Sequence, residues 1–253
     1  MTNDRREMIN QTIQKKGEVK IKELKEMFPD VSGMTLRRDL NYLENEGHIV
    51  RIWGGAKSID HLTESEEEKY SSRETENIEA KLKIANKAIQ LIETGRSIFI
   101  DSGTTTMCLA EAMPDKDLSI ITSGPNIGME IIKKNNPSVT LIGGQLNRNN
   151  ISISGPNAVN FIENINIDIA FMGTSGFSLD SGFTSGNFNE CQLKSNIINK
   201  ARKVIMLMYI SKIDKNMPFT FASIEEIDII VSEKDPEKNI INFLKQKDVE
   251  ILV

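Results

Sequence analysis

The chain has 253 residues, 39% of them hydrophobic, and a formal net charge of −5 at pH 7. This length suits two domains, and no apolar run approaches the ~18 residues that a membrane helix needs, so we expect no membrane partner. The N-terminus lacks the apolar core of a secretory signal, and two cysteines and two histidines offer no metal-ligand cluster. We therefore expect a cytoplasmic protein without metal or cofactor.

Two helices are predicted before residue 29. Residues 4–15 are amphipathic through Ile9 and Ile13, and residues 20–28 carry a second set of apolar positions. Pro29 cannot extend the second helix and begins a turn. Only a few residues separate this turn from the next predicted helix, which is the spacing of a helix-turn-helix.

The third predicted helix follows Ser32, whose side chain is expected to cap it, and ends before Gly47. Leu36, Leu40 and Leu43 recur at helical spacing and predict one buried stripe. A short β-prone segment and a Gly-Gly turn come next. A helix followed by a short basic hairpin is the pattern of a winged helix-turn-helix.

The exposed face of the third helix predicts contact with a DNA major groove, because paired arginines lie behind a polar N-terminus. Lysines of the second helix and basic residues of the hairpin are candidates for backbone phosphates. The alternative is a small three-helix bundle whose arginines only solvate one face. The DNA-binding candidates are Lys20, Lys22, Ser32, Gly33, Met34, Thr35, Arg37, Arg38, Asn41, Arg51 and Lys57.

The charge balance changes after this region. Residues 1–57 carry 11 Lys and Arg against 9 Asp and Glu, whereas residues 58–80 carry 2 against 8. The glutamate-rich, apolar-poor run predicts an acidic linker over residues 58–75, followed by a helix from about residue 76 to residue 92. Because the positive charge of residues 1–57 is small, we expect DNA binding to need two or more copies of this domain.

From residue 97 onward, seven short β-branched runs alternate with helical segments. This alternation predicts an α/β domain over residues 76–253 with a largely parallel sheet. Ligands in such folds bind at the carboxyl ends of the strands. The expected strands are residues 97–100, 118–122, 139–142, 168–172, 204–208, 227–231 and 249–252.

The first of these strands leads into a stretch of glycine and hydroxyl residues that is followed at once by a helix. We expect Gly103 to allow a tight turn, and the helix amides, hydroxyls and dipole to bind an anion such as phosphate. The alternative is a Ser- and Thr-rich helix cap without a ligand. Residues at other strand ends are candidates for the same pocket, so the full set is Asp101, Ser102, Gly103, Thr104, Thr105, Thr106, Thr122, Ser123, Gly143, Gly144, Gly173 and Lys212.

Three further residues allow two interpretations each. Lys212 is equally consistent with a phosphate contact and with a solvated loop lysine. For Lys194, on a predicted helix, solvent exposure is slightly favoured over the pocket. Glu190 is either a vestigial acid or base, or a carboxylate that only complements a helix dipole.

These motifs resemble those of the DeoR family of bacterial transcriptional regulators. The family patterns V-S-x-x-T-[IL]-R-R-D-L, L-E-x-x-G and R-x-x-G-G-A match residues 31–40, 43–47 and 51–56. The larger domain is similar to the family's effector domain, whose fold resembles ribose-5-phosphate isomerase and CoA transferases. Its patterns D-S-G-T-T, G-G, E-x-x-x-K and S-K fall at residues 101–105, 143–144, 190–194 and 211–212. Before them, the family has an aromatic, an arginine and K-x-x-I-A, which Tyr70, Arg73, either Lys81 or Lys83, and Ile84-Ala85 resemble.

This chain departs from the family pattern at two positions that bear on contacts to a sugar. The family usually has asparagine at the position of Ser123 and aspartate at the position of Tyr209.

The resemblance implies a repressor of a sugar-metabolism operon that binds double-stranded operator DNA under the control of a phosphorylated sugar. It also implies a homo-oligomer, either a dimer or a tetramer, and no catalytic residues. The alternative is a sugar-phosphate isomerase-like enzyme with an appended DNA-binding module. Its carboxylate candidates would be Asp101, Asp168 and Glu190, although Asp168 opens its strand and should lie far from the pocket.

Overall fold

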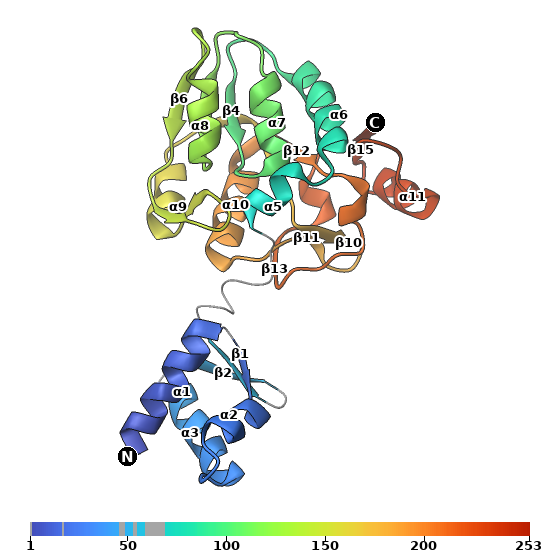
Figure 1. The fold of residues 1–253 in the computed structure, drawn as a ribbon. Coiled ribbons are helices and arrows are strands. Elements are labelled where there is room, and N and C mark those ends of the chain that lie inside the picture. Colours follow the sequence, from blue (N-terminus) through green and yellow to red (C-terminus); the bar gives the residue numbers. More distant parts are fainter. Residues whose placement is uncertain (1, 17, 46–48, 53–54, 59–68) are drawn as a thin grey trace. The chain divides into compact units, whose positions relative to one another are not determined.

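A computed structural model describes residues 2–16, 18–45, 49–52, 55–58 and 69–253 (Figure 1). Contacts divide the chain into two units, residues 1–65 and residues 66–253. Within the described residues, no helix is long and apolar enough to cross a membrane. The predicted combination of a winged helix-turn-helix and a parallel α/β sheet is confirmed.

The first unit contains three helices and a three-stranded antiparallel sheet in the order β1-β3-β2. Its elements are α1 (Thr2–Lys16), β1 (Glu18–Lys20), α2 (Ile21–Met27), α3 (Gly33–Asn45), β2 (Ile49–Ile52) and β3 (Gly55–Ser58). All three predicted helices are confirmed, whereas β1 was not expected. This strand is only three residues long, and its place beside β3 depends on pairing with residues 55–57.

Helix α3 begins and packs as its sequence predicts. The amide of Thr35 donates to Ser32 Oγ at 3.2 Å, which is the expected N-terminal cap. Leu36 and Leu40 are fully buried and Leu43 is 4% exposed, in one core with Ile9, Ile13 and Leu24. The predicted turn residues Gly47 and Gly54 lie outside the described residues, as does Trp53.

The second unit is built on a seven-stranded sheet in which every neighbouring pair is parallel, in the order β15-β14-β12-β9-β4-β5-β6. The seven strands predicted from β-branched runs are all present. They are β4 (Ser97–Ile100), β5 (Ser119–Thr122), β6 (Ser138–Leu141), β9 (Ile167–Gly173), β12 (Ala201–Leu207), β14 (Ile229–Val231) and β15 (Glu250–Leu252). The chain adds strands in one direction from β4 to β6 and in the other from β9 to β15, so the order reverses between β4 and β9.

Helices cover both faces of this sheet, because successive strand residues point to opposite sides. In β4, Ile98 and Ile100 pack with α6, α7 and α8, whereas Phe99 packs with α9, α10 and α11. The helices are α5 (Tyr70–Thr75), α6 (Ile78–Ala88), α7 (Thr104–Ala112), α8 (Pro125–Ile131), α9 (Pro156–Ile162), α10 (Phe188–Lys200) and α11 (Lys238–Gln246), with short 3-10 turns η1 (Ile89–Leu91), η2 (Ile210–Lys212) and η3 (Ile224–Glu226).

Five short strands outside the main sheet were not predicted. β7 (Gln145–Asn147) and β8 (Ser152–Ser154) form a hairpin, and β10 (Gly176–Ser178), β11 (Gly182–Ser185) and β13 (Phe219–Ala222) form an antiparallel sheet. Runs of three or four residues are too short to show a period in the sequence.

Helix α5 corrects the predicted extent of the linker. Residues 58–75 were expected to be linker, but residues 70–75 form this helix. Tyr70 is 4% exposed, and its amide donates to the carbonyl oxygen of Asn149 at 2.7 Å. The acidic composition of the preceding residues concealed this short helix, which packs within the second unit.

Candidate functional site

The predicted DNA-binding residues of the third helix lie mainly on its exposed side. Ser32, Met34, Arg37, Arg38 and Asn41 are exposed, and Met34 is 79% exposed. Gly33 and Thr35 are partly buried at the helix start, and Lys20 and Lys22 are exposed where β1 meets α2. Lys57 lies in β3, and its side chain falls outside the described part of the chain.

The aspartate that follows the two arginines has a different role from its neighbours. Asp39 is fully buried and accepts from Arg5 Nε at 2.7 Å and from Arg6 Nε at 2.9 Å. The guanidinium of Arg6 also lies 3.9 Å from the ring centroid of Tyr42. These contacts hold α3 against α1, so Arg37 and Arg38 are presented from a fixed helix. No pattern in the sequence pointed to Arg5 and Arg6.

Arg51, which was expected to contact DNA phosphates, contacts α3 in this structure. Its Nη1 donates to the carbonyl oxygen of Arg37 at 3.4 Å and to Asn41 Oδ1, and its amide donates to Glu44 Oε1 at 2.9 Å. Strand β2 is therefore tied to the C-terminal half of α3. The Oδ1 atom of Asn41 is engaged by this contact.

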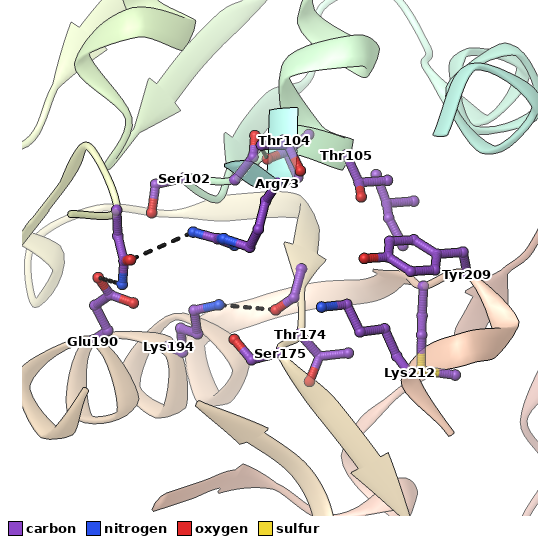
Figure 2. A pocket seen from close by; sticks show the side chains of 16 residues that line it. Arg73, Ser102, Thr104, Thr105, Thr174, Ser175, Glu190, Lys194, Tyr209 and Lys212 are labelled. Carbon is purple, nitrogen blue, oxygen red and sulfur yellow. Dashed lines mark hydrogen bonds between the residues drawn. The ribbon is translucent and has the colours of Figure 1, made fainter. Parts of the chain in front are cut away.

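A polar cavity lies in the second unit where the strand order reverses, at the carboxyl ends of β4, β9 and β12 (Figure 2). Such reversal points are where open α/β sheets bind ligands. The cavity and its open mouth enclose about 530 Å³. It is lined by Arg73, Ser102, Gly103, Thr104, Thr105, Thr106, Asn150, Gly173, Thr174, Ser175, Glu190, Lys194, Leu207, Met208, Tyr209 and Lys212.

Seven of the predicted ligand-binding residues line this cavity: Ser102, Gly103, Thr104, Thr105, Thr106, Gly173 and Lys212. Four others do not. Thr122 braces the sheet by donating to the carbonyl oxygen of Ile100 at 2.7 Å, and Ser123 Oγ accepts from the amide of Ser102 at 3.1 Å, behind the loop. Gly143 and Gly144 follow the edge strand β6, which β5 separates from β4, so they lie away from the cavity.

Asp101, the remaining predicted residue, lies beneath the cavity and not on its wall. It is 2% exposed, and its Oδ2 lies 2.7 Å from Lys194 Nζ and accepts from the amide of Gly173 at 3.0 Å. Lys194 also donates to the carbonyl oxygen of Gly173 at 2.9 Å. The preference for a solvent-exposed Lys194 was therefore wrong, because its side chain is 7% exposed and its ammonium joins α10 to the ends of β4 and β9.

The start of α7 presents backbone donors to the cavity. The helix begins at Thr104, and the amide of Met107 donates to the carbonyl oxygen of Gly103 at 3.0 Å. Met107 is the first residue of α7 whose amide has an acceptor within the helix, so the amides before it have no intrahelical partner. The helix dipole also places partial positive charge at this end. The φ angle of Gly103 is 160°, so its own backbone is extended, and the chain bends at Ser102 and Gly103 before the helix begins.

Arg73, Asn150 and Glu190 form a polar chain along another wall. Arg73 Nη2 donates to Asn150 Oδ1 at 3.4 Å, and Asn150 Nδ2 donates to Glu190 Oε1 at 3.0 Å (Figure 2). Ser152 Oγ donates to the same carboxylate oxygen. Glu190 is thus a buried acceptor, and neither of its sequence interpretations anticipated these partners.

Several lining residues were missed as pocket residues. Arg73 belongs to the aromatic-arginine pattern of the family resemblance, which was the one available signal. Asn150 sits in the loop of an unpredicted hairpin. Thr174 and Ser175 continue past the end of β9, and Tyr209 had been noted only as a departure from the family pattern.

The charges that line the cavity favour an anion. Arg73, Lys194 and Lys212 are cationic and their side chains point into the same space, while Glu190 is the carboxylate on the wall (Figure 2). Asp101 balances Lys194 from below. The surplus of positive charge, the α7 amides and the hydroxyl groups suit a small ligand that carries an anionic group. The described residues contain no cluster of His, Cys, Asp and Glu that could hold a metal ion.

Comparison with known proteins matches each of the two units to a family model. Residues 5–61 match the model of the DeoR-like helix-turn-helix domain, and residues 76–234 match that of the DeoR C terminal sensor domain. The regulator GlpR of Haloferax volcanii is 37% identical over 80% of this chain and 78% of its own length. The glycerol-3-phosphate regulon repressor of Escherichia coli K12 is 29% identical over 96% of this chain and 95% of its own length.

Among solved structures, ribose 5-phosphate isomerase A from Methanocaldococcus jannaschii overlaps 53% of this chain and 53% of its own, at 17% identity and a TM-score of 0.39. An overlap of this extent says nothing about activity. The sensor-domain match alone spans more than half of the sequence. Together with the helix-turn-helix match, it establishes that this chain belongs to the DeoR family of transcriptional regulators.

Proposed function

We propose that this protein is a repressor whose binding to operator DNA is controlled by a phosphorylated sugar or polyol in the cavity of the second unit. The observation that carries this proposal is the convergence of the α7 amides with Arg73, Lys194 and Lys212 at the point where the strand order reverses. A phosphate suits this set because it accepts several charge-assisted hydrogen bonds at once. The hydroxyls and Glu190 on the walls are partners for sugar hydroxyl groups.

The names of relatives support the same effector class. The Escherichia coli relative is named as a repressor of the glycerol-3-phosphate regulon. We infer that the effector of this chain is a small phosphate ester. The polar lining of the cavity, with hydroxyl groups beside cationic side chains, suits a small polar ester better than an apolar ligand.

DNA binding is assigned to residues 1–57, with the start of α3 at base edges. Arg37, Arg38 and Thr35 are the proposed groove contacts, and Lys20 and Lys22 are proposed to hold phosphates. The small positive charge of this unit favours two or more copies acting together, so we propose that residues 76–253 assemble into a dimer or tetramer. Sedimentation of the full chain tests this, and a monomer would contradict it.

Thermal unfolding of the full chain with candidate effectors tests the ligand proposal. Glycerol 3-phosphate, fructose 1-phosphate, fructose 6-phosphate and ribose 5-phosphate are compared with the same compounds without phosphate. A ligand that binds only the folded state at 100 times its Kd stabilises by about 2.7 kcal/mol. We expect at least one phosphate ester to stabilise the protein and its unphosphorylated parent to have no effect.

The ligand should then change DNA affinity. A DNA fragment selected by the protein from a random pool serves as the operator, and the stabilising ester is titrated into the complex. Thr105→Val removes one hydroxyl from the cavity wall and should weaken the response, whereas Thr140→Val, on the exposed edge strand β6, is the matched control. An unchanged response in the Thr105 variant would place the phosphate elsewhere.

An enzymatic role is not part of this proposal, because the carboxylates are poorly placed for one. Asp101 is paired with Lys194, and Glu190 accepts from Asn150 and Ser152. Asp168 accepts from the amide of Ser97 at the amino-terminal ends of β9 and β4, whereas the cavity lies at their carboxyl ends. An aldose–ketose isomerase needs a positioned base next to its substrate. Purified protein should not interconvert ribose 5-phosphate and ribulose 5-phosphate, and turnover would contradict this assignment.

A further inference from the structure

We propose that Arg73 binds the phosphate of the effector and that α5, the helix that carries it, transmits occupancy of the cavity to the segment that joins the two units. This inference rests on the proposed effector and adds the route by which it acts. The cavity residue Arg73 lies only a few residues after that segment, because α5 begins at Tyr70 and residues 59–68 precede it in the chain.

The first step concerns the acceptors available to Arg73. In the structure its Nη2 donates to the neutral amide oxygen of Asn150 at 3.4 Å, near the upper limit for a hydrogen bond. A phosphate is a charged acceptor that matches the fork of a guanidinium, and such bonds are shorter and about twice as strong as neutral ones. An effector phosphate at the α7 amides therefore competes with Asn150 for the Arg73 side chain.

The second step concerns how tightly side chain and helix are coupled. Lys81 of α6 is fully buried, and its Nζ donates to the carbonyl oxygen of Arg73. Burial lowers the pKa of Lys81, because it disfavours the charged form, and the carbonyl oxygen of Arg73 gives the buried amine a hydrogen-bond partner. Because the backbone of Arg73 is clamped, a movement of its guanidinium toward a ligand acts on the whole six-residue helix.

The third step concerns what resists that movement. The amide of Tyr70 donates to the carbonyl oxygen of Asn149, next to Asn150, and its phenol oxygen accepts from Asn126 Nδ2 at 2.7 Å. Both ends of α5 are thus held by the loop between β7 and β8, by α8 and by α6. When Arg73 exchanges Asn150 for a phosphate, one tie to the 149–150 loop is lost while the tie to Lys81 persists. The helix then has two arrangements, one for the empty cavity and one for the filled cavity.

Hydrogen exchange of the full chain with inorganic phosphate as the probe tests the first two steps. We expect phosphate to change exchange in residues 102–107 and also in residues 69–76. A response confined to residues 102–107 would overturn the role of α5 and leave the proposed phosphate site intact. No response in either segment, together with no stabilisation by any phosphate ester, would overturn both the role of α5 and the proposed phosphate site.

The coupling itself is measured with the stabilising phosphate ester and the selected DNA fragment. The coupling ratio is the Kd of the ester in the presence of DNA divided by its Kd in its absence. Lys81→Met replaces the amine by an apolar chain of similar length at a residue that does not line the cavity, and should keep the ester Kd within threefold. The coupling ratio should move at least fivefold toward one.

Lys83→Met, two residues along α6 and exposed, is the control and should keep the parental ratio. Arg73→Lys keeps the charge but loses the fork, and should both weaken ester binding and reduce the coupling ratio. If folded Lys81→Met protein retains the parental ratio, or if Arg73→Lys binds the ester as tightly as the parent, the proposed route is wrong. A loss of ester binding in Lys81→Met would reduce its role to holding the cavity together and would also overturn it.

Discussion

Removal of the Lys194 ammonium is predicted to destabilise the second unit strongly. Its Nζ lies 2.7 Å from Asp101 Oδ2, and the two side chains are 7% and 3% exposed. Lys194→Met leaves the Asp101 carboxylate buried with the Gly173 amide as a donor but without this counter-charge. Breaking a buried ion pair by removing one partner costs about 3–5 kcal/mol, so we expect a loss in that range.

A double substitution separates this charge effect from a packing defect. Asp101→Asn in the Lys194→Met background removes the buried charge while keeping the side-chain shape. The two residues are in contact, so their effects should not add, and the double variant should recover about 1–3 kcal/mol relative to Lys194→Met. Simple loss of side-chain packing would instead make the double variant no more stable than the single one.

Urea unfolding of the full chain, followed by far-ultraviolet circular dichroism, measures these changes. The single tryptophan, Trp53, lies in the first unit, so its fluorescence reports that unit separately and should not shift. Lys83→Met is the surface control. If Lys194→Met unfolds within about 0.5 kcal/mol of that control, which is the usual range of surface substitutions, the reasoning about the ion pair is refuted.

Three further predictions concern other contacts. Arg38→Ala should weaken binding to the selected DNA by about 1–3 kcal/mol, because we propose that Arg38 contacts a base. Fluorescence anisotropy measures this, with Lys15→Ala on α1 as the control. If the Arg38 variant binds as tightly as the control, the groove assignment is contradicted. Asp39→Ala should destabilise the first unit, seen as an earlier Trp53 fluorescence transition, because it leaves the Arg5 and Arg6 charges without their shared carboxylate. Burial raises the pKa of Tyr70 from 10.0 to about 12, so its contribution to stability is full below pH 10 and is lost as pH rises toward 12. Tyr70→Phe should flatten that alkaline loss in thermal unfolding scans, and an unchanged pH profile would show that Tyr70 does not cause it.

Local patterns were sufficient for the elements that make up the frame of each unit. The stripe of Leu36, Leu40 and Leu43 identified a helix with one buried side, and Ser32 marked its start, because both features depend only on neighbouring residues. The strands of the parallel sheet were visible for a similar reason. The inner strands are largely buried, so they appear in the sequence as short apolar runs, whereas the edge strands β6 and β15 are more exposed.

The partners of charged side chains were not visible in this way. Lys194 and Asp101 are 93 positions apart in the chain and form an ion pair at 2.7 Å. Arg51 was expected on DNA but contacts Asn41, and Asp39 joins Arg5 and Arg6 across more than 30 positions. A charged residue gives the same local signal whether it meets solvent, a ligand or a distant partner.

The sequence by itself therefore determined the helix-turn-helix, the parallel α/β sheet and the glycine- and hydroxyl-rich loop after β4 that we propose binds an anion, since caps, periodicity and strand-to-helix transitions are local properties. Only the tertiary structure decided which strand ends meet. The reversal of strand order places β4 beside β9, which brings Ser102 and Gly173 to one cavity and leaves Gly143 and Gly144 at the sheet edge. The tertiary structure also brings Arg73 to this cavity, from a segment that was predicted to be linker. Such placement depends on pairing between distant strands and helices, and no short stretch of sequence encodes it.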